Sequence, residues 1–212
     1  MTDQNKHHAR RNVEDYSEVM KNEKSTNNFF RTFISKPKNI HLDIQNKDEK
    51  IILVLRQHLI TQLKSFLFLC MIILLIPILL NFSGFIETFP DKFIGAFYIF
   101  WIVLTFGLFT RTFLIWFFNV YIITDERIID VDFASMIYHN ISYAKIENIE
   151  DVTARTTGPL AAIFNYGTIL IQTAGEKTEF EFGNVPQPAK VTKLISELLL
   201  EEEKEKIEGR VN

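Results

Sequence analysis

Cysteine is nearly absent from this sequence, whose 212 residues include a single one, Cys70. One cysteine excludes an intramolecular disulfide framework and excludes zinc or iron–sulfur sites built from several thiolates. Positive charge is also scarce, because 23 Lys and Arg stand against 26 Asp and Glu, a formal net charge of −3. This balance excludes a protein whose whole surface is built to bind nucleic acid.

Motifs for catalysis are missing as well. The sequence has no G-x-S-x-G, Walker A, G-x-G-x-x-G or H-E-x-x-H pattern. Its five histidines show no paired spacing of the kind that metal ligands require. Cys70 lies in an apolar run, where burial disfavours a reactive thiolate. We therefore expect no enzymatic activity, no catalytic residues, no metal and no cofactor.

Apolar residues are concentrated in two long runs in the middle of the chain. Residues 65–86 contain no formal charge over 22 positions, and residues 93–110 contain none over 18. As helices they would be about 33 Å and about 27 Å long, and the hydrocarbon core of a bilayer is roughly 30 Å thick. Pro77, in the first run, is tolerated in membrane helices. We therefore expect a two-helix transmembrane hairpin over residues 65–117 rather than buried helices of a soluble protein.

The cations that flank these runs predict the orientation of the hairpin. Four cations lie within about 20 residues before the first run. The connecting loop 87–92 has one cation, and Arg111 and Arg127 follow the second run. Positive charge favours the cytoplasmic side, so we expect a multi-pass protein of the cell membrane with both termini in the cytoplasm. Candidate membrane-interface residues are Arg56, Lys64, Arg111 and Trp116.

The segment before the hairpin is polar. Residues 1–39 have mixed charge and no sustained periodicity, which predicts a disordered cytoplasmic tail. Aromatic and basic residues at 28–38 could instead lie on an anionic membrane surface, although an unstructured linker is favoured. Residues 40–64 form a juxtamembrane lead-in, in which the apolar run 51–55 could be a strand or a helix. Periodicity cannot decide between the two over five residues.

Residues 118–207 have the pattern of a folded domain. Short β-rich runs alternate with turn signals, which predicts an antiparallel meander of about six strands. These runs are 119–124, 127–133, 136–143, 147–156, 166–174 and 178–183. Residues 189–206 should form a helix with one apolar stripe, and residues 208–212 a disordered end. Phe180 and Phe182 alternate with acidic residues and should face the core together with Leu194 and Leu198.

Gly167 opens one of these runs, directly after a polar turn. A glycine in that position usually has a positive φ or lies where another backbone comes close. We therefore expect replacement of Gly167 to be costly.

The order of these segments resembles the bacterial pleckstrin-homology (PH)-like domain membrane proteins of the DUF304 type. The resemblance covers roughly residues 40–200. It depends on N-x-Y-x-I-T-x-x-R-I-I (119–129), K-I-x-x-I-x-D-V (145–152), F-N-Y-G-T-I-x-I (164–171), V-P-x-P (185–188) and the lead-in 48–58. It implies an α+β chain in which a transmembrane helical hairpin is followed by a PH-like β-barrel of seven strands, capped by a C-terminal helix. The seventh strand would be the run 51–55 or one not recognised.

Charge argues against the lipid ligand that a PH-like fold suggests. Residues 119–188 carry four cations and ten anions, a net charge of −6, which an anionic membrane surface repels. We therefore expect a non-enzymatic, membrane-anchored PH-like module that binds a protein partner or organises a membrane complex. Its working surface would be a sheet edge or the open end of the barrel. The partners expected are the lipid bilayer and an unidentified protein, with no nucleic acid and with a homo-oligomer left open.

Two other functions compete with this expectation. A lipid-sensing or lipid-binding membrane protein would use the cations at the membrane boundary. A membrane enzyme or transporter subunit is disfavoured, because the apolar runs contain no acid or histidine of the kind that marks a transport path.

Overall fold

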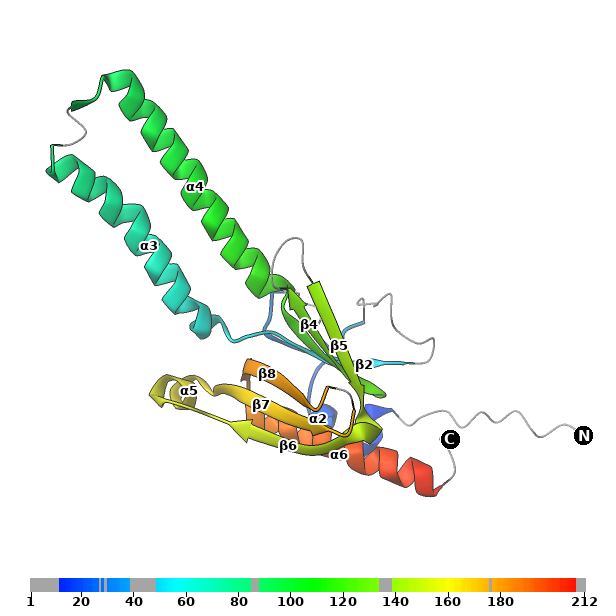
Figure 1. Ribbon diagram of the computed structural model, residues 1–212. Helices are drawn as coiled ribbons and strands as arrows, with labels where there is room; N and C mark the ends of the chain where they lie inside the picture. Colours follow the sequence, from blue (N-terminus) through cyan, green and yellow to red (C-terminus); the bar gives the residue numbers. More distant parts are fainter. Residues whose placement is uncertain are drawn as a thin grey trace, which may run out of the picture. The chain divides into compact units, whose positions relative to one another are not determined.

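The structure is a computed structural model that describes residues 12–26, 28, 30–38, 49–84, 88–133, 139–175 and 177–208. The chain divides into two compact units (Figure 1). We call the unit Leu59–Phe118 the hairpin, and the unit formed by Met1–His58 with Asn119–Asn212 the domain. The domain is therefore built from chain on both sides of the hairpin.

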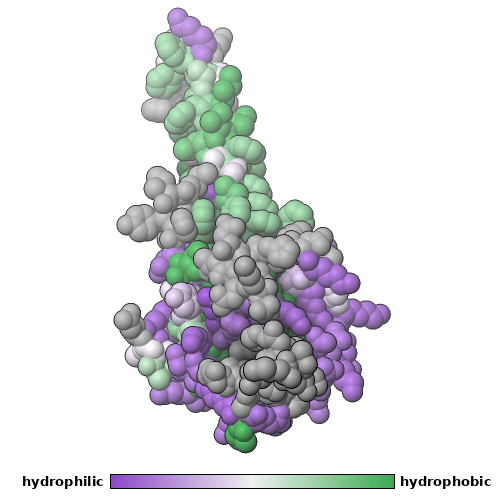
Figure 2. Space-filling model, turned by 90° about the vertical axis from the view of Figure 1, so that its right-hand side faces the viewer, coloured by the Kyte–Doolittle hydropathy of each residue, from purple (hydrophilic) through white to green (hydrophobic). Residues whose placement is uncertain are grey.

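The hairpin consists of α3 (Leu59–Phe82) and α4 (Asp91–Phe118). Both helices are long and apolar enough to cross a membrane. The rings of Phe66 and Phe109 pack 5.5 Å apart, and Asn81 Nδ2 donates to the Tyr98 hydroxyl at 2.6 Å. Apart from such contacts the helices leave their apolar side chains exposed, and the hairpin surface in Figure 2 is accordingly hydrophobic.

The domain contains two antiparallel sheets. The first, which we call sheet A, has the strand order β1-β2-β3-β4-β5, and the second, sheet B, has the order β6-β7-β8. The strands of sheet A are β1 (Phe33–Ser35), β2 (Ile51–Leu55), β3 (Val120–Thr124), β4 (Arg127–Phe133) and β5 (His139–Lys145). The strands of sheet B are β6 (Ile149–Arg155), β7 (Tyr166–Thr173) and β8 (Glu179–Pro186). All six strands expected after the hairpin are present, and the run 51–55 is a strand.

Helices complete the domain. They are α1 (Val13–Tyr16), α2 (Glu18–Lys21), α5 (Pro159–Phe164), α6 (Pro188–Ile207) and the 3-10 turn η2 (Ile146–Asn148). The helix α6 matches the expected amphipathic helix and packs its apolar stripe against sheet B. Its Lys193 forms an exposed ion pair with Glu18 of α2 at 2.6 Å.

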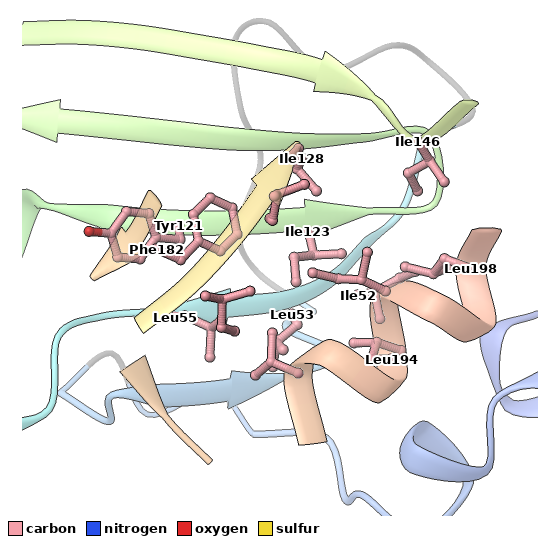
Figure 3. Packing of buried hydrophobic residues seen from close by; sticks show 14 of the residues in the cluster. Ile52, Leu53, Leu55, Tyr121, Ile123, Ile128, Ile146, Phe182, Leu194 and Leu198 are labelled. Carbon is pink, nitrogen blue, oxygen red and sulfur yellow. The ribbon is translucent and has the colours of Figure 1, made fainter. Parts of the chain in front are cut away.

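The core of the domain lies between the two sheets and α6 (Figure 3). Phe180 and Phe182 are completely buried, as is Leu194, while the intervening Glu179 and Glu181 are exposed. The expected orientation of this strand is therefore confirmed. In Figure 3, Ile52 of β2 and Ile123 of β3 lie between the strands and α6, and Tyr121 lies against Phe182, so the strand before the hairpin is part of the same core as the strands after it.

Three expectations need correction. The first is the closed barrel: among the described residues, no strand of sheet A pairs with a strand of sheet B. The turn η2 redirects the chain after β5, so β6 pairs with β7 instead of continuing sheet A. The sheets are joined at isolated points, such as the 3.1 Å hydrogen bond from Gly183 N to the Tyr121 hydroxyl. Over the described ranges, the domain thus consists of two separate sheets that do not close into a barrel, with α6 packed against sheet B.

The second correction concerns the predicted disordered tail. In the described part of residues 12–38, β1 pairs with β2, and Met20 is completely buried in the core. The polar composition concealed this order, because a segment that covers an existing core needs few apolar residues of its own. Residues 1–11 and 209–212, which include most of the predicted disordered end, lie outside the described residues.

The third correction concerns boundaries. The domain includes residues before the hairpin and does not begin at 118, and the lead-in 40–64 is divided between the two units. The helix α3 begins six residues before the uncharged run, because helix formation does not require the charge-free composition that defined that run.

Candidate interaction surfaces

The strand β5 is an edge of sheet A within the described part of the chain. It pairs with β4 over its full length, from Arg127↔Lys145 to Phe133↔His139, and has no strand on its other side. An edge strand presents unpaired backbone groups that can accept a further strand. Among the described strands, β5 is therefore one candidate location for the expected working surface, beside the other edges β1, β6 and β8.

The backbone hydrogen-bond pattern shows which residues of β5 face this open side. Ile146 N donates to Glu126 O at 2.9 Å, so residues 126 and 146 form a hydrogen-bonded pair one step beyond the ladder. Hydrogen-bonded and non-hydrogen-bonded pairs alternate along antiparallel strands. Ile141 and Tyr143 therefore occupy non-hydrogen-bonded pairs, and their N–H and C=O groups point away from β4 toward the open edge.

The same two residues are the exposed large hydrophobic residues of β5. Ile141 is 42% exposed and Tyr143 is 60% exposed. They lie directly opposite Val131 and Ile129 on β4, so all four side chains share one face of the sheet. This edge thus combines outward backbone groups with an apolar face.

A largely buried ion pair lies next to this edge, beside Tyr143. Arg127 Nε donates to Glu49 Oε1 at 2.9 Å, and its Nη2 donates to Glu49 Oε2 at 2.7 Å. The Glu49 side chain is completely buried, and its hydrogen bonds raise the pKa of Arg127. The guanidinium lies 5.4 Å from the centre of the Tyr143 ring. The pair therefore fixes β4 to the segment before β2 and places a cation on Tyr143.

The residues that lead from β2 to the hairpin are held by sheet B. His58 N donates to Asn184 O at 2.8 Å, and the His58 ring stacks on Tyr166 at 5.4 Å. Burial lowers the pKa of His58. Nearby, the Tyr121 ring stacks on Phe182 at 4.6 Å, and burial raises the pKa of its hydroxyl. The point at which the chain leaves the domain for α3 is thus fixed by side-chain and backbone contacts.

The four candidate membrane-interface residues fall in both units. Arg56 belongs to the domain, where it is 6% exposed, donates from Nη1 to Arg31 O at 3.2 Å, and has a pKa lowered by burial. Lys64 and Arg111 are exposed on the hairpin, at the same end as the Phe66–Phe109 contact. Trp116 is 6% exposed and packs on Phe113 and Phe117. Their role at a membrane interface stays a prediction.

Sequence reasoning missed a lysine-rich pocket at the other end of β2. The pocket has a volume of about 650 Å³ and is lined by Lys21, Lys24, Lys36, Lys38 and Lys50, with Glu14 and Glu23 among them. Lys36 pairs with Glu14 at 2.6 Å, and Lys50 Nζ donates to Asn12 Oδ1 at 3.0 Å. A charge count restricted to residues 119–188 could not find this pocket, because four of the lysines come from the segment expected to be disordered and Lys50 comes from the lead-in 40–64.

Acidic and histidine side chains do not gather into a metal site in the part of the chain that the structure describes. On β4, Asp130 takes part in an ion pair rather than in a cluster of acidic residues. Asp130 pairs with Lys177 at 3.3 Å, and burial raises the pKa of its carboxyl group. Asp130 therefore links sheet A to the turn between β7 and β8.

Comparison with known proteins supports the resemblance seen in the sequence. The family model described as bacterial PH domain matches residues 58–199, more than half of the chain. A similar solved structure is a DUF1696 family protein with a pleckstrin-homology domain from Shewanella loihica PV-4. It is 15% identical, has a TM-score of 0.30, and the match covers 38% of this chain and 69% of that one. No curated protein matches.

The family match includes the hairpin together with most of the domain, from His58 through most of α6. The bacterial PH domain family is typically non-catalytic. The segment that supplies β1, β2 and the lysine-rich pocket precedes the matched residues. The resemblance is thus confirmed, and the chain belongs to the bacterial PH domain family.

Proposed function

We propose that this protein is a non-enzymatic, membrane-anchored PH-like module that binds a partner protein by adding a strand to the β5 edge. The observation that carries the proposal is the coincidence, at Ile141 and Tyr143, of outward backbone groups and exposed apolar side chains. In strand addition, backbone hydrogen bonds provide affinity and alternate side chains provide specificity.

The chemistry of the edge describes the partner segment. It would be extended and would place apolar side chains at alternate positions, so that they cover Ile141 and Tyr143 on one face of the enlarged sheet. A positive charge in the partner segment is disfavoured over Tyr143, because the guanidinium of Arg127 already lies there.

The hairpin supports the membrane anchoring. Its side chains are apolar on all sides, and Ile102, Val103 and Phe106 are each more than 60% exposed. Exposing that apolar surface to water costs free energy, whereas placing it in the hydrocarbon core of a bilayer does not. The flanking cations support a cytoplasmic domain with a short external loop.

The anchoring can be tested by cysteine labelling of intact cells. In a Cys70→Ser background, Ser83→Cys should react with an impermeant maleimide from outside, and Ile207→Cys should react only after the membrane is opened. Reaction at Ile207→Cys but not at Ser83→Cys in intact cells would reverse the orientation. Reaction of neither or both would contradict the hairpin topology.

The partner can be tested in native membranes with a photocrosslinking residue in place of Tyr143. We expect a discrete crosslinked product that disappears in Ile141→Pro, because proline removes one outward N–H group without removing a bond to β4. A crosslinker in place of Leu200, which is 56% exposed on α6, provides the matched control. Crosslinks to lipid alone, or a product that Ile141→Pro leaves unchanged, would contradict strand addition.

The lysine-rich pocket favours a second candidate, the binding of an anionic ligand. Five lysines against two glutamates give the lining a net charge of +3, opposite in sign to that of residues 119–188. In detergent, tripolyphosphate should raise the unfolding temperature if the pocket binds anions. That shift should vanish in Lys24→Glu with Lys38→Glu and persist in Lys204→Glu, which changes an exposed lysine of α6. Equal shifts of the unfolding temperature in the unmodified protein, the double variant and Lys204→Glu would exclude the pocket as the anion-binding site.

A further inference from the structure

We infer that α5 is a third membrane contact, which inserts its apolar face into the interfacial layer of the same bilayer that α3 enters. The inference depends on the membrane anchoring in the proposed function. It identifies a surface of the domain itself, rather than of the hairpin, that meets lipid.

The helix α5 exposes large apolar side chains on a short element. Leu160 is 56% exposed, Ile163 is 73% exposed and Phe164 is 43% exposed, whereas Ala161 is 1% exposed and faces the domain. Single exposed apolar residues are common on protein surfaces, but three within six residues form a patch that usually meets a partner or a membrane.

The backbone holds this patch in a fixed position. Gly158 before the helix has a φ of 95°, and Asn165 after it has a φ of 51°, so both ends have turn conformations that few residues adopt. The carbonyl of Asn165 accepts a hydrogen bond from Gln187 N at 2.8 Å, which anchors the end of α5 to the start of α6. The apolar side chains are therefore presented by a defined helix and not by a free loop.

The patch lies beside the residue from which the chain leaves the domain. The rings of Phe164 and His58 are 6.5 Å apart, and His58 also stacks on Tyr166. Because α3 begins at Leu59, the next residue, α5 is next to the start of α3 by chain connectivity alone. The five helical steps from Leu59 to Lys64 span about 8 Å, which is comparable to the thickness of one headgroup layer. An α3 that enters the bilayer thus brings α5 to the level of the headgroups.

The charge pattern around α5 fits a lipid surface. Residues 156–175 contain no charged residue over 20 positions, and Arg155 precedes them. The anions that give residues 119–188 their net charge of −6 all lie outside this stretch. The domain can therefore approach anionic headgroups with this neutral segment, where repulsion is small. The attraction would come from apolar burial and would depend little on salt.

The test uses the full chain in phosphatidylcholine vesicles, with Cys70→Ser as the background and an environment-sensitive fluorophore on single cysteines. Ile163→Cys probes α5, Tyr143→Cys probes another exposed position of the domain, on β5, and Leu75→Cys probes the middle of the uncharged run 65–86 in α3. Quenching is compared between lipids with a nitroxide near the headgroup and lipids with one deep in the acyl chain. Near-ultraviolet circular dichroism confirms that each variant is folded.

We expect the label at 163 to lose fluorescence mainly to the shallow quencher, in low and high salt alike. The label at 143 should lose none, and the label at 75 should lose it mainly to the deep quencher. No quenching at 163 with deep quenching at 75 would overturn the inference and leave the anchoring intact. No quenching at 75 would overturn the anchoring itself. A fluorescence change at 163 that requires high protein density, without quenching, would assign α5 to a second copy and likewise overturn the inference.

Discussion

The hairpin and the domain use the same apolar residue types in opposite ways. In the domain, Phe180 and Phe182 are completely buried and the acids between them are exposed. In the hairpin, Phe100 is 63% exposed and Phe106 is 70% exposed. Alternation with acids gives a strand one solvent-exposed polar face and one buried apolar face. A helix that is apolar on all sides has no polar face. The pattern of polar residues, and not the number of apolar ones, thus distinguishes the two units.

The largest expected difference between the units is the cost of removing one phenylalanine ring. Phe182→Ala should destabilise the domain by about 3–5 kcal/mol, because it empties a completely buried site and removes the stacking on Tyr121. Phe106→Ala in the hairpin, and Glu181→Ala beside the buried ring, should leave the stability of the domain unchanged.

This difference can be measured by hydrogen exchange of the full chain in detergent micelles, peptide by peptide. Faster exchange in β7 and α6 is expected for Phe182→Ala alone. Tryptophan fluorescence is not a suitable probe, because both tryptophans, Trp101 and Trp116, lie in α4 of the hairpin. Equal effects of Phe182→Ala and Glu181→Ala would show that the assigned orientation of β8 is wrong.

A second comparison lies within the domain, between a buried and an exposed ion pair. Glu49→Gln leaves the largely buried Arg127 without its carboxylate and should cost about 3 kcal/mol, the lower end of the range for breaking a buried pair. Glu18→Gln breaks the exposed pair with Lys193 and should cost nothing measurable. Urea unfolding in micelles compares the two variants. Similar midpoints would mean that water reaches the Glu49–Arg127 pair.

Local pattern predicted much of the fold but not its non-local parts. The six strands after the hairpin and α6 have alternation or helical periodicity that is visible within each segment, because each carries its own apolar face. The segments α2 and β1 carry few apolar residues, so Met20 and Ile34 are buried only because a core formed elsewhere receives them. The run 51–55 was undecided for another reason: five residues are too few for periodicity to distinguish strand from helix, and its partners β1 and β3 are set by tertiary pairing.

The candidate surfaces were harder to predict than the fold. That some sheet edge would be available could be expected, but its identity depends on the turn η2, which prevents β6 from extending sheet A. The lysine-rich pocket collects residues from both sides of β1, and the position of α5 beside His58 is set by tertiary contacts. Each of these surfaces is formed by tertiary contacts between segments that are far apart in the sequence, and local sequence patterns do not predict such contacts.

A smaller effect is expected where backbone rather than side chains fill the space. At Gly167, φ is not in the left-handed region, so the close-approach alternative is the one that holds. A Cβ there would lie 2.5 Å from Arg155 O and 3.1 Å from Pro188 Cγ. Gly167→Ala should therefore destabilise the domain by about 1–3 kcal/mol, since the first neighbour is a backbone atom in a paired strand. Gly175→Ala, whose nearest neighbour would be at 3.7 Å, is the matched control in thermal unfolding. A neutral Gly167→Ala would show that β6 and β7 can separate at this point.

The smallest effect should be a pH dependence at the junction between the two units. Burial lowers the folded-state pKa of His58 below its ordinary value near 6.5. Well above pH 6.5 the residue is neutral whether the chain is folded or unfolded, so it adds no pH dependence there. As the pH falls from 6.5 toward the folded pKa, the unfolded chain binds the proton first and the free energy of unfolding decreases. His58→Gln should remove this decrease while keeping a polar side chain. Urea midpoints of the unmodified protein and of His58→Gln, measured in micelles between pH 5 and 8, isolate the contribution of His58, because both proteins share all other titrating groups. Parallel pH profiles would mean that the ring of His58 is hydrated at the junction, and that its stacking on Tyr166 does not hold the start of α3.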